Sequence, residues 1–292
     1  MNYDFSYRTY VGYIEPALKQ VLAGIHPPLK EAMAYSLLAE GKRLRPVLVL
    51  ACCEAVGGET NQALPFACAL EMIHAYSLIH DDLPCMDDDD LRRGRPTNHK
   101  VFGEGMAVLA GDGLLSLAFE LMAQQAADSE AAAGAGAALL AVARGAGVHG
   151  MVGGQSRDLS NTGQTVDLNE LRRTHAQKTG ALITAACLAG AYLGGADETR
   201  RRAIEAYGQQ LGMAFQIADD ILDATSDAQA LGKTPGKDAR DHKTTYVSLC
   251  GLEQAQTLAR SAAQMAMNAL EPLGESAWFL CKTAQRAALR SK

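Results

Sequence analysis

The chain has 292 residues, of which 48% are hydrophobic and 5% aromatic, enough for a large core in one big domain or two smaller ones. Its net charge of −6 at pH 7 argues against general nucleic-acid binding, which requires a basic surface. The seven cysteines form no CxxC pair, so we expect reduced thiols in a cytoplasmic protein, without disulfides or a zinc site. The N-terminus lacks a signal-peptide pattern and no apolar run is long enough to cross a bilayer, so we expect no membrane span.

Long stretches of good helix formers lie between scattered prolines. From Gln62 to His80, apolar residues recur three and four positions apart, which predicts one helix; the same spacing predicts another from Arg201 to Thr225. The Ala- and Gly-rich stretch from Ala126 to Gly150 is compatible with a thin helix or with helix ends and a flexible join. Period-two alternation is almost absent and no linker or strong repeat divides the chain. We therefore predict an all-α protein with a single domain over residues 1–292.

The stretch His80–His99, HDDLPCMDDDDLRRGRPTNH, packs six aspartates into ten residues, followed by three arginines within four. Asp81 and Asp82 come just before Pro84, which resists continuation of a helix. Their carboxylates converge with those of residues 87–90 if the chain bends there; alternatively, residues 87–90 form a solvated charge run after a helix end. An EF-hand loop is disfavoured because its alternating acids and central glycine are missing. The adjacent His-Asp pair is a very weak signal for a phosphohydrolase metal site.

A second acidic group, DDILD, covers residues 219–223. On a helix, Asp219 and Asp223 lie on one face, one turn apart, among apolar neighbours. Like charges at this spacing repel, and burial of an unpaired charge is costly, so these carboxylates need cations. Mg²⁺ fits, since it characteristically binds through one or two carboxylates plus substrate phosphates.

Basic residues accompany both acidic groups. Arginine forks and lysine ammonium groups are the usual protein partners of phosphate oxygens. Singly, each is better explained as a surface charge, but jointly they suggest a diphosphate held through Mg²⁺ on one side and cationic side chains on the other. The four basic groups are Lys42 with Arg43 and Arg45; Arg92 with Arg93 and Arg95; Lys178; and Lys233 with Lys237 and Lys243.

Six motifs, taken together and in order, resemble the short-chain isoprenyl diphosphate synthase family, and within it the bacterial farnesyl diphosphate synthases. The similarity runs from about Tyr35 to Leu249. The final stretch, ESAWFLCKTAQRAALRSK, matches poorly, and Arg157 stands where the family usually has a small or apolar residue. The motifs are GKRLRP, HDDLPCMDDDDLRRG, GGQSRDL, HAQKTGALI, FQIADDILD and LGKTPGKD followed by HKTTYVSL.

This resemblance implies an all-α bundle around a deep central cavity, usually as a homodimer. The two aspartate motifs would face each other across the cavity mouth, and three Mg²⁺ ions would grip the diphosphate of an allylic substrate. The implied metal ligands are Asp81, Asp82, Asp87 and Asp219, with Asp88 and Asp223 as direct or more distant participants.

The resemblance also implies the substrate contacts. The allylic diphosphate would be contacted by Arg92, Lys178 and Lys233, with Lys243 a further candidate. The isopentenyl diphosphate site would comprise Lys42, Arg45, His74 and Arg93. Without the resemblance, His74 would be interpreted as a packed helix histidine.

The implied reaction condenses isopentenyl diphosphate with dimethylallyl or geranyl diphosphate. Mg²⁺ and cationic side chains stabilise the leaving diphosphate, and an apolar cavity keeps the allylic cation from water. In the family, oxygens at the positions of Thr179 and Gln216 and the carbonyl of Lys178 steady this cation. The released diphosphate would take the final proton, so no protein base is assigned. The implied catalytic residues are Asp81, Asp82, Arg92, Lys178, Thr179, Gln216 and Asp219.

Product length should depend on the depth of the cavity below the metals. Ser77 lies one turn before Asp81 on its helical face, and the bulky Tyr76 is adjacent. An aromatic residue five positions before the first aspartate resembles the bacterial farnesyl diphosphate synthases. The motif DDLPCMD also resembles that of plant-type geranylgeranyl diphosphate synthases, which lack that aromatic residue. We therefore predict Tyr76 as the cavity floor and farnesyl diphosphate as the product, with geranylgeranyl diphosphate as the alternative.

Other classes of protein remain to be distinguished. A class I terpene cyclase shares an aspartate-rich motif and an all-α fold, but DDILD and GKRLRP argue against it. A non-catalytic subunit of a heteromeric prenyl synthase often lacks one aspartate motif, whereas both are intact here. A metal-dependent phosphohydrolase would be revealed by release of phosphate from prenyl diphosphates.

Overall fold

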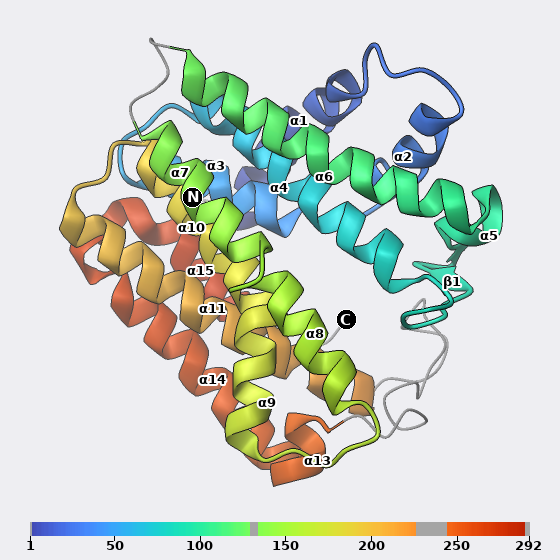
Figure 1. Cartoon of the computed structure of the whole chain (residues 1–292). Helices are drawn as coiled ribbons and strands as arrows, with labels where there is room; N and C mark the ends of the chain where they lie inside the picture. Colours follow the sequence, from blue (N-terminus) through green and yellow to red (C-terminus); the bar gives the residue numbers. More distant parts are fainter. Residues whose placement is uncertain (1, 129–133, 226–243, 290–292) are drawn as a thin grey trace.

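The computed structural model describes residues 2–128, 134–225 and 244–289 (Figure 1). Within these ranges the chain is almost entirely helical, with a single antiparallel pair of two-residue strands, which confirms the predicted all-α class. The elements are α1 (Tyr3–Val21), α2 (Leu29–Leu37), α3 (Leu44–Ala55), α4 (Thr60–Asp81), β1 (Leu91–Arg92), β2 (Arg95–Pro96), α5 (Asn98–Phe102), α6 (Glu104–Ala127), α7 (Ala135–Ala146), α8 (Met151–Asn161), α9 (Leu168–His175), the π-helix η1 (Ala176–Gly180), α10 (Ala181–Leu193), α11 (Glu198–Thr225), α13 (Tyr246–Cys250), α14 (Leu252–Ala269), the 3₁₀-helix η2 (Glu271–Ala277) and α15 (Trp278–Ala288).

Both helices predicted from apolar spacing are present. The first predicted helix, Gln62–His80, lies inside α4, and the second, Arg201–Thr225, lies inside α11. The Ala- and Gly-rich stretch contains helix ends, because α6 ends at Ala127 and α7 runs from Ala135 to Ala146.

Helix α4 lies at the centre of the bundle, with α3, α6 and α10 packed around it (Figure 1). Apolar side chains cover all of its faces, as expected for a helix with no solvent side. Glu71 is its one charged residue that is fully buried. The helix is exposed at its N-terminal end, at Asn61 and Gln62, and is half-buried at its C-terminal end, where the aspartates begin.

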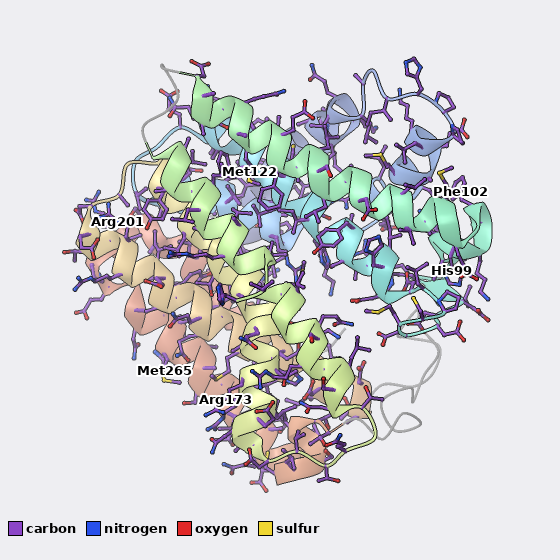
Figure 2. The ribbon with its side chains drawn as sticks, viewed as in Figure 1. His99, Phe102, Met122, Arg173, Arg201 and Met265 are labelled. Atoms are coloured by element: carbon purple, nitrogen blue, oxygen red, sulfur yellow. The ribbon has the colours of Figure 1, made fainter. Side chains whose placement is uncertain are left out.

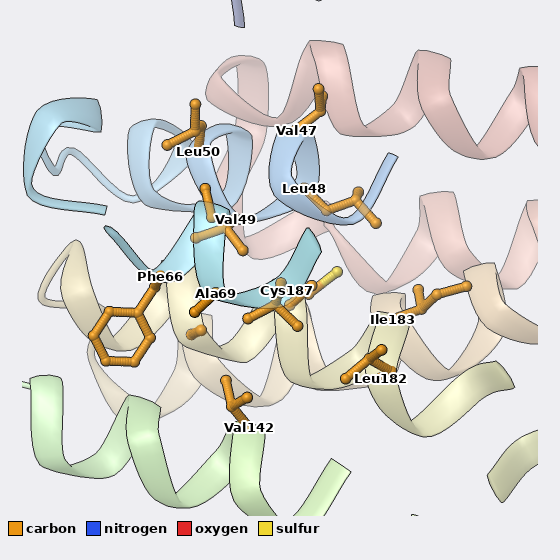
Figure 3. Close-up of a cluster of buried hydrophobic side chains, with 14 of the residues drawn as sticks. Val47, Leu48, Val49, Leu50, Phe66, Ala69, Val142, Leu182, Ile183 and Cys187 are labelled. Atoms are coloured by element: carbon orange, nitrogen blue, oxygen red, sulfur yellow. The ribbon is translucent and has the colours of Figure 1, made fainter. Parts of the chain in front are cut away.

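The hydrophobic core includes the region where α3 and α10 pack against each other and against α4 (Figure 3). Gly190 on α10 allows this contact, because a Cβ there would collide with the carbonyl oxygen of Val49 and lie 2.9 Å from the Cβ of Cys52. The side chains of Leu48, Val49 and Cys187 are completely buried. This rigid centre holds α4 and α10 in fixed register, and both lead into the candidate site.

The two ends of the chain meet on one side of the bundle. Tyr3 on α1 stacks on Phe279 of α15 with ring centroids 4.9 Å apart. Arg286 on α15 forms an ion pair with Asp4 at 2.6 Å. Helix α15, which contains most of the described part of the stretch that matched poorly in sequence, therefore packs against α1.

Two stretches correct the expectation that no apolar segment is long enough to cross a membrane. By length and composition, Glu104–Ala127 and Ala135–Asn161 are each long and apolar enough to cross a membrane. Alanine and other apolar residues are frequent in these segments, and charged residues are few. In each, less than half of the most apolar window is buried inside the structure. This is weak support for a membrane span, since core helices of soluble proteins have the same composition.

Candidate active site

The first acidic group begins where α4 ends. Asp81 is the last helical residue, and the chain then folds back, so that the backbone N–H of Asp87 donates to the carbonyl of Asp81 at 2.8 Å. The N–H of Asp89 likewise donates to the carbonyl of Asp82 at 3.2 Å. The bend on which convergence of the aspartates depended is therefore present, with Asp88 in a left-handed conformation at φ 49°.

Asp81 is in an environment that disfavours its charged form. Its pKa is raised to about 6, chiefly by burial. Lys178 and Arg92 oppose this rise, whereas Asp87 and Asp82 add to it. Lys178 lies on the π-helix far along the chain, so its influence indicates that this basic residue approaches the end of α4.

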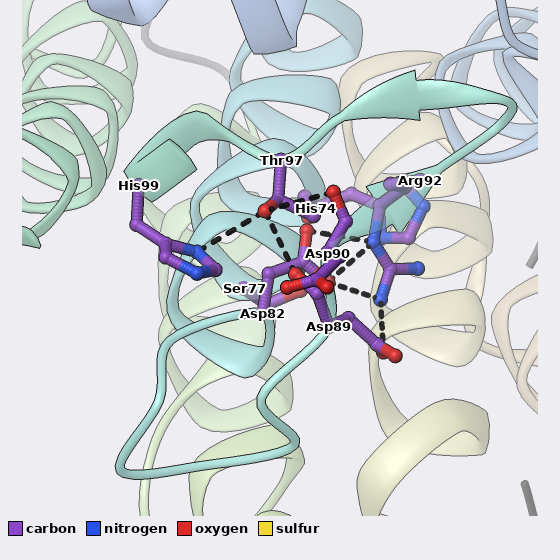
Figure 4. Close-up of polar contacts among 8 residues, drawn as sticks. All are labelled: His74, Ser77, Asp82, Asp89, Asp90, Arg92, Thr97 and His99. Carbon is purple, nitrogen blue, oxygen red and sulfur yellow. Dashed lines mark hydrogen bonds and ion pairs between the residues drawn. The ribbon is translucent and has the colours of Figure 1, made fainter. Parts of the chain in front are cut away.

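Arg92 is held in the site by Asp82 (Figure 4). Its Nε donates to both carboxylate oxygens of Asp82, at 2.7 and 2.9 Å, and its Nη2 lies 2.6 Å from Oδ1 and 3.7 Å from an oxygen of Asp89. The short hairpin β1–β2 turns Arg92 back over the helix end. Asp82 is buried, so this charge-assisted pairing offsets the cost of its burial.

The aspartate run 87–90 has two kinds of member. Asp89 is buried beside Arg92, and the hydroxyl of Thr97 donates to its backbone carbonyl at 2.7 Å (Figure 4). Asp90 is exposed and forms an ion pair with Lys100 at 2.7 Å. The interpretation as a solvated charge run therefore holds for Asp90 but not for the whole run.

A basic pocket opens on the neighbouring face of α4. Its volume is about 50 Å³, and its lining includes His74, Asp82, Arg92, Arg93 and Tyr35. Arg93 adopts a left-handed conformation at φ 54°, and its Nη1 donates to the carbonyl of Glu40 at 2.6 Å. The pocket therefore shares Asp82 and Arg92 with the acidic site.

His74 lies among arginines. Its pKa is lowered well below 6.5, first by burial and then by the positive charges of Arg45, Arg93, Arg92 and Arg43. The imidazole is therefore neutral at physiological pH. This field of positive charge is the environment that a diphosphate would neutralise.

Lys42 and Arg45 flank a buried structural arginine. The side chain of Lys42 is exposed and its carbonyl accepts the hydroxyl of Tyr7 at 2.5 Å, whereas Arg45 is half-buried. Arg43 between them is 4% exposed and forms ion pairs with Glu71 at 2.7 Å and Glu15 at 2.8 Å. Sequence reasoning grouped all three as phosphate ligands, but Arg43 anchors the turn into α3.

The π-helix η1 carries Lys178 and Thr179. Single-turn π-helices within α-helical runs often occur at functional sites. Lys178 Nζ donates to Asp158 Oδ2 on α8 at 2.7 Å. Sequence reasoning missed Asp158, although it lies within the motif GGQSRDL.

Two glycines allow the π-helix to pack tightly. A Cβ on Gly154 of α8 would collide with the backbone nitrogen of Lys178, and one on Gly212 of α11 would lie 2.7 Å from the Cα of Gly180. The π-helix is therefore held between the backbones of α8 and α11, which fixes where its side chains start.

A hydrogen-bonded chain connects the π-helix to the second acidic group. The hydroxyl of Thr179 donates to Gln216 Oε1 at 2.8 Å, and Gln216 Nε2 donates to Asp220 Oδ1 at 3.1 Å. The other oxygen of Asp220 accepts the backbone N–H of Tyr246 at 2.8 Å. Asp220 is buried and structural, a role that the motif DDILD alone did not distinguish from metal binding.

The two predicted members of DDILD lie closer to solvent. Asp219 is half-buried and Asp223 is exposed near the end of α11. In residues 2–128, 134–225 and 244–289, no three His, Cys, Asp or Glu side chains converge as a metal cluster. The carboxylates of a magnesium site repel one another unless cations separate them. The predicted ligand set thus stays a prediction, together with Lys233 and Lys243, which lie outside the described residues.

The residue types around Asp81 nevertheless fit Mg²⁺. This ion is bound by oxygen donors, characteristically one or two carboxylates with substrate phosphates. Asp81 is a partly buried carboxylate with a raised pKa near two other carboxylates, and a divalent cation would relieve that mutual repulsion.

The predicted chain-length residues lie on α4 just before Asp81. Tyr76 is 6% exposed, its ring lies edge-on to His80 with centroids 5.7 Å apart, and its pKa is raised to about 12 by burial and by Asp81. Ser77 is half-buried, and its hydroxyl donates to the carbonyl of His74 at 2.9 Å. Neither residue lines the basic pocket, so α4 presents different faces to the pocket and to the region below the aspartates.

Two polar residues of α8 add to the site. Arg157, unexplained in the sequence, bonds Glu170 of α9 at 2.8 Å and Gln177 of the π-helix at 3.2 Å. Gln155 has a buried amide whose oxygen and nitrogen both lack a hydrogen-bond partner in the part of the chain that is described. Since buried polar groups are nearly always paired, Gln155 is a further candidate for ligand contact.

Comparisons with known proteins agree on one family. The family model described as "Polyprenyl synthetase" matches residues 26–272. A farnesyl diphosphate synthase of Geobacillus stearothermophilus is 44% identical over 274 residues, covering 92% of each chain. Geranylgeranyl pyrophosphate synthase 12, chloroplastic, of Arabidopsis thaliana is 46% identical over 275 residues, covering 90% of this chain and 76% of the relative. The crystal structure of an FPP/GFPP synthase from Zymomonas mobilis superposes with a TM-score of 0.87 at 38% identity, covering 98% of this chain and 99% of that one.

Proposed function

Because the chain belongs to the polyprenyl synthetase family and is a prenyltransferase, we propose that it makes farnesyl diphosphate. The substrates would be isopentenyl diphosphate and an allylic diphosphate, dimethylallyl or geranyl. The observation that carries this proposal is that the C-terminal end of α4 borders both a basic site and an acidic site. One face borders a basic pocket, the next presents clustered carboxylates, and Asp82 with Arg92 belongs to both.

Asp81, Asp82, Asp87 and Asp219 would hold Mg²⁺, with three ions expected when diphosphate is bound. When bound, Mg²⁺ neutralises the charge that develops on a leaving diphosphate. Asp82 would exchange part of its contact with Arg92 for this role. Arg92 would then be free to turn its donors toward phosphate oxygens, which its planar fork matches well.

Lys178 and Arg92 would bind the allylic diphosphate as cationic donors. The pairing of Lys178 with Asp158 keeps the ammonium extended toward the site rather than into solvent. Lys233 and Lys243 would add further positive charge. Electrostatic stabilisation of this kind is commonly the largest contribution to catalysis.

Thr179 and Gln216 would steady the allylic cation. Because the hydroxyl proton of Thr179 is donated to Gln216 Oε1, and the Gln216 amide N–H₂ to Asp220, the Thr179 oxygen keeps its lone pairs and Gln216 Oε1 keeps one. The buried contacts around η1 exclude water from one side, which protects a reactive cation. The released diphosphate would accept the final proton.

Lys42, Arg45, His74 and Arg93 would bind isopentenyl diphosphate. The neutral His74 contributes a hydrogen bond rather than a charge, and the arginines supply the positive field. Separate pockets for the two diphosphates allow both substrates to be present before the bond forms, which is the main requirement of a condensation.

The product is proposed to be farnesyl diphosphate because of the position of Tyr76. This residue lies one helical turn from His80 and close enough to Asp81 for the carboxylate charge to raise the pKa of its phenol. A bulky ring there would limit the growing chain. Geranylgeranyl diphosphate is the alternative, since relatives of both names resemble this chain to a similar degree.

We propose a cytoplasmic homodimer. Large apolar side chains are exposed along α6 and α8, among them Leu109 at 55%, Val152 at 45% and Leu159 at 44%. Exposed apolar surface of this kind is typical of an interface. The same surface accounts for the apolar composition of these helices without a membrane.

Incubation with labelled isopentenyl diphosphate, geranyl diphosphate and Mg²⁺ tests the proposed reaction. Label should enter longer allylic diphosphates, and a chelator should abolish this. A hydrocarbon product would indicate a cyclase, and phosphate release without elongation would indicate a phosphohydrolase. Elongation that appears only after a second protein is added would indicate a non-catalytic subunit.

A further inference from the structure

A second hollow lies on the outer face of α10, between α7 and α11, and reaches α9 and Tyr246. Its volume of about 690 Å³ lies within the ~300–1,000 Å³ of ordinary small-molecule pockets. No residue of the proposed catalytic set lines it. We call it the outer groove and define it by six of its lining residues: Arg172, His175, Ala181, Thr184, Leu188 and Gln210.

The floor of the outer groove is apolar. Small side chains of α7 and α10, including Ala141, Ala181 and Ala185, keep it low, and Leu188 lies half-buried along it. Between Gly180 and Tyr192 the groove follows α10 for roughly 18 Å, at about 1.5 Å per residue. A floor of this length and composition suits a hydrocarbon chain better than a compact polar ligand.

The two ends of the outer groove differ in charge. At the Tyr192 end, Arg201 (labelled in Figure 2) and Arg202 both form ion pairs with Glu198 at 2.7 Å, so their charges are largely compensated. At the α9 end, Arg172 hydrogen-bonds the phenol of Tyr246. Among the described residues, however, its buried Nε has no partner.

Two more buried polar atoms, on residues that line the same groove, have no hydrogen-bond partner within the described ranges. They are Nδ1 of His175 and Oε1 of Gln210. An unsatisfied buried polar atom costs on the order of 1–3 kcal/mol, so three on one groove indicate a site that receives a polar group. Burial lowers the pKa of His175 to about 4, against a smaller opposing effect of Asp158, so the imidazole is a neutral hydrogen-bonding group and Arg172 carries the positive charge.

We propose that the outer groove binds a long-chain anion, with the hydrocarbon chain on the floor of α10 and a phosphate or carboxylate head at Arg172, His175 and Gln210. The Gln210 amide can present its N–H₂ group to the head after a rotation that exchanges its oxygen and nitrogen. The charge is complementary, because four arginines but only two glutamates line the groove, in a chain whose net charge is −6.

The outer groove shares a wall with the candidate active site. Ala176 and Gly180 of the π-helix line the groove, whereas Lys178 and Thr179 of the same helix bond Asp158 and Gln216. An occupant would therefore contact the backbone from which the catalytic side chains project. On the proposed prenyltransferase function, we expect occupancy to change turnover, but binding itself does not depend on that function.

Equilibrium dialysis with labelled oleate and, separately, labelled farnesyl monophosphate tests the binding. A chelator is present throughout to remove metal-dependent binding elsewhere. Leu188→Trp fills the floor and Arg172→Gln removes the head donor; each should weaken binding about tenfold or more, comparable with loss of a charge-assisted hydrogen bond or of a well-packed chain. Arg173→Gln is the matched control, because Arg173 follows Arg172 on α9 but is exposed (Figure 2).

Binding of either probe that is lost in both groove variants and kept in Arg173→Gln supports the proposal, and the tighter probe identifies the source of the ligand as a prenyl phosphate or a fatty acid. Binding that is equal in all variants, binding of neither probe, or binding of inorganic phosphate alone would overturn it. Because no turnover is measured, failure here is distinct from failure of the prenyl elongation assay.

Discussion

Gly154 on α8 and Lys178 in the π-helix touch backbone to backbone. A Cβ on Gly154 would collide with the nitrogen of Lys178 and lie 2.5 Å from its Cα. The position of Lys178, and hence of its ammonium beside Asp158, is therefore set by the absence of one side chain on the neighbouring helix.

Gly154→Ala should displace the π-helix and lower turnover on the order of 100-fold, since a shift of about 1 Å in a catalytic group can cost that much. Steady-state kinetics with geranyl and isopentenyl diphosphates measures the effect. Gly136→Ala is the control, because a Cβ at this exposed position on α7 has nothing within 4 Å. It should keep wild-type kinetics and stabilise the fold by no more than about 1 kcal/mol. Wild-type turnover in Gly154→Ala would contradict the proposed constraint.

Arg92→Lys should reduce turnover on the order of 100-fold, although the charge is kept. A lysine cannot reproduce the contact of one guanidinium with both oxygens of Asp82 and with a phosphate, and loss of one such donor typically costs that much. Arg95→Lys, at an exposed position of the same hairpin, should be milder. Equal effects of the two substitutions would mean that the Asp82–Arg92 geometry is not important for catalysis.

Glu71→Gln should lower the free energy of unfolding by roughly 1–3 kcal/mol, because it removes one of the two carboxylates that pair with the buried guanidinium of Arg43, while Glu15 remains. The side chains of this pair are 3% and 5% exposed. Asp4→Asn breaks the Arg286 ion pair, whose side chains are 55% and 53% exposed, and should lower the free energy of unfolding much less. Urea denaturation of both variants measures the difference. Similar losses would show that burial of the Arg43 pair does not decide its contribution.

The stability of the protein should depend on pH through His175. Its pKa is about 4 in the fold and 6.5 ordinarily, so the unfolded chain binds a proton below about pH 6.5 and the folded chain only below about pH 4. The contribution of His175 to stability is therefore fully present above pH 6.5 and is lost as the pH falls toward 4. His175→Gln should show a shallower loss over this interval in urea titrations, whereas His26→Gln, at an exposed histidine, should follow the wild type. Parallel curves for wild type and His175→Gln would contradict this.

Tyr76→Ala should lengthen the products beyond farnesyl diphosphate, because it removes a buried ring below Asp81. Chromatography of the dephosphorylated products gives their lengths. Tyr13→Ala, at an exposed tyrosine of α1, is the control and should leave the product unchanged. If products stay the same in Tyr76→Ala, Tyr76 is not the cavity floor.

Periodic residues were predictable from sequence, and irregular backbone was not. The spacing of apolar residues located α4 and α11 to within a few residues, because burial on a helix requires that spacing. After Pro84 the path could not be predicted, since the fold-back depends on hydrogen bonds such as Asp87 N–H to the carbonyl of Asp81. The π-helix was equally invisible, because it arises from packing between Gly154 and Gly212 rather than from its own sequence.

Residue type alone also could not separate functional from structural charges. Arg43 and Asp220 belong to motifs that looked like ligand sites, yet both are buried in contacts within the protein. Asp158 was overlooked because nothing in the sequence indicates that it meets Lys178 across two helices. Such pairings are determined by the tertiary arrangement, which local patterns do not encode.

Incubation of the purified protein with Mg²⁺, labelled isopentenyl diphosphate and, in separate reactions, dimethylallyl, geranyl and farnesyl diphosphates tests the proposed activity most directly. Chain length is measured after phosphatase treatment. We predict farnesol from the two shorter starters and no extension of farnesyl diphosphate. Absence of elongation from every starter, with metal and both substrates present, would contradict prenyl synthesis by this chain. Geranylgeraniol as the main product would contradict the assignment of Tyr76.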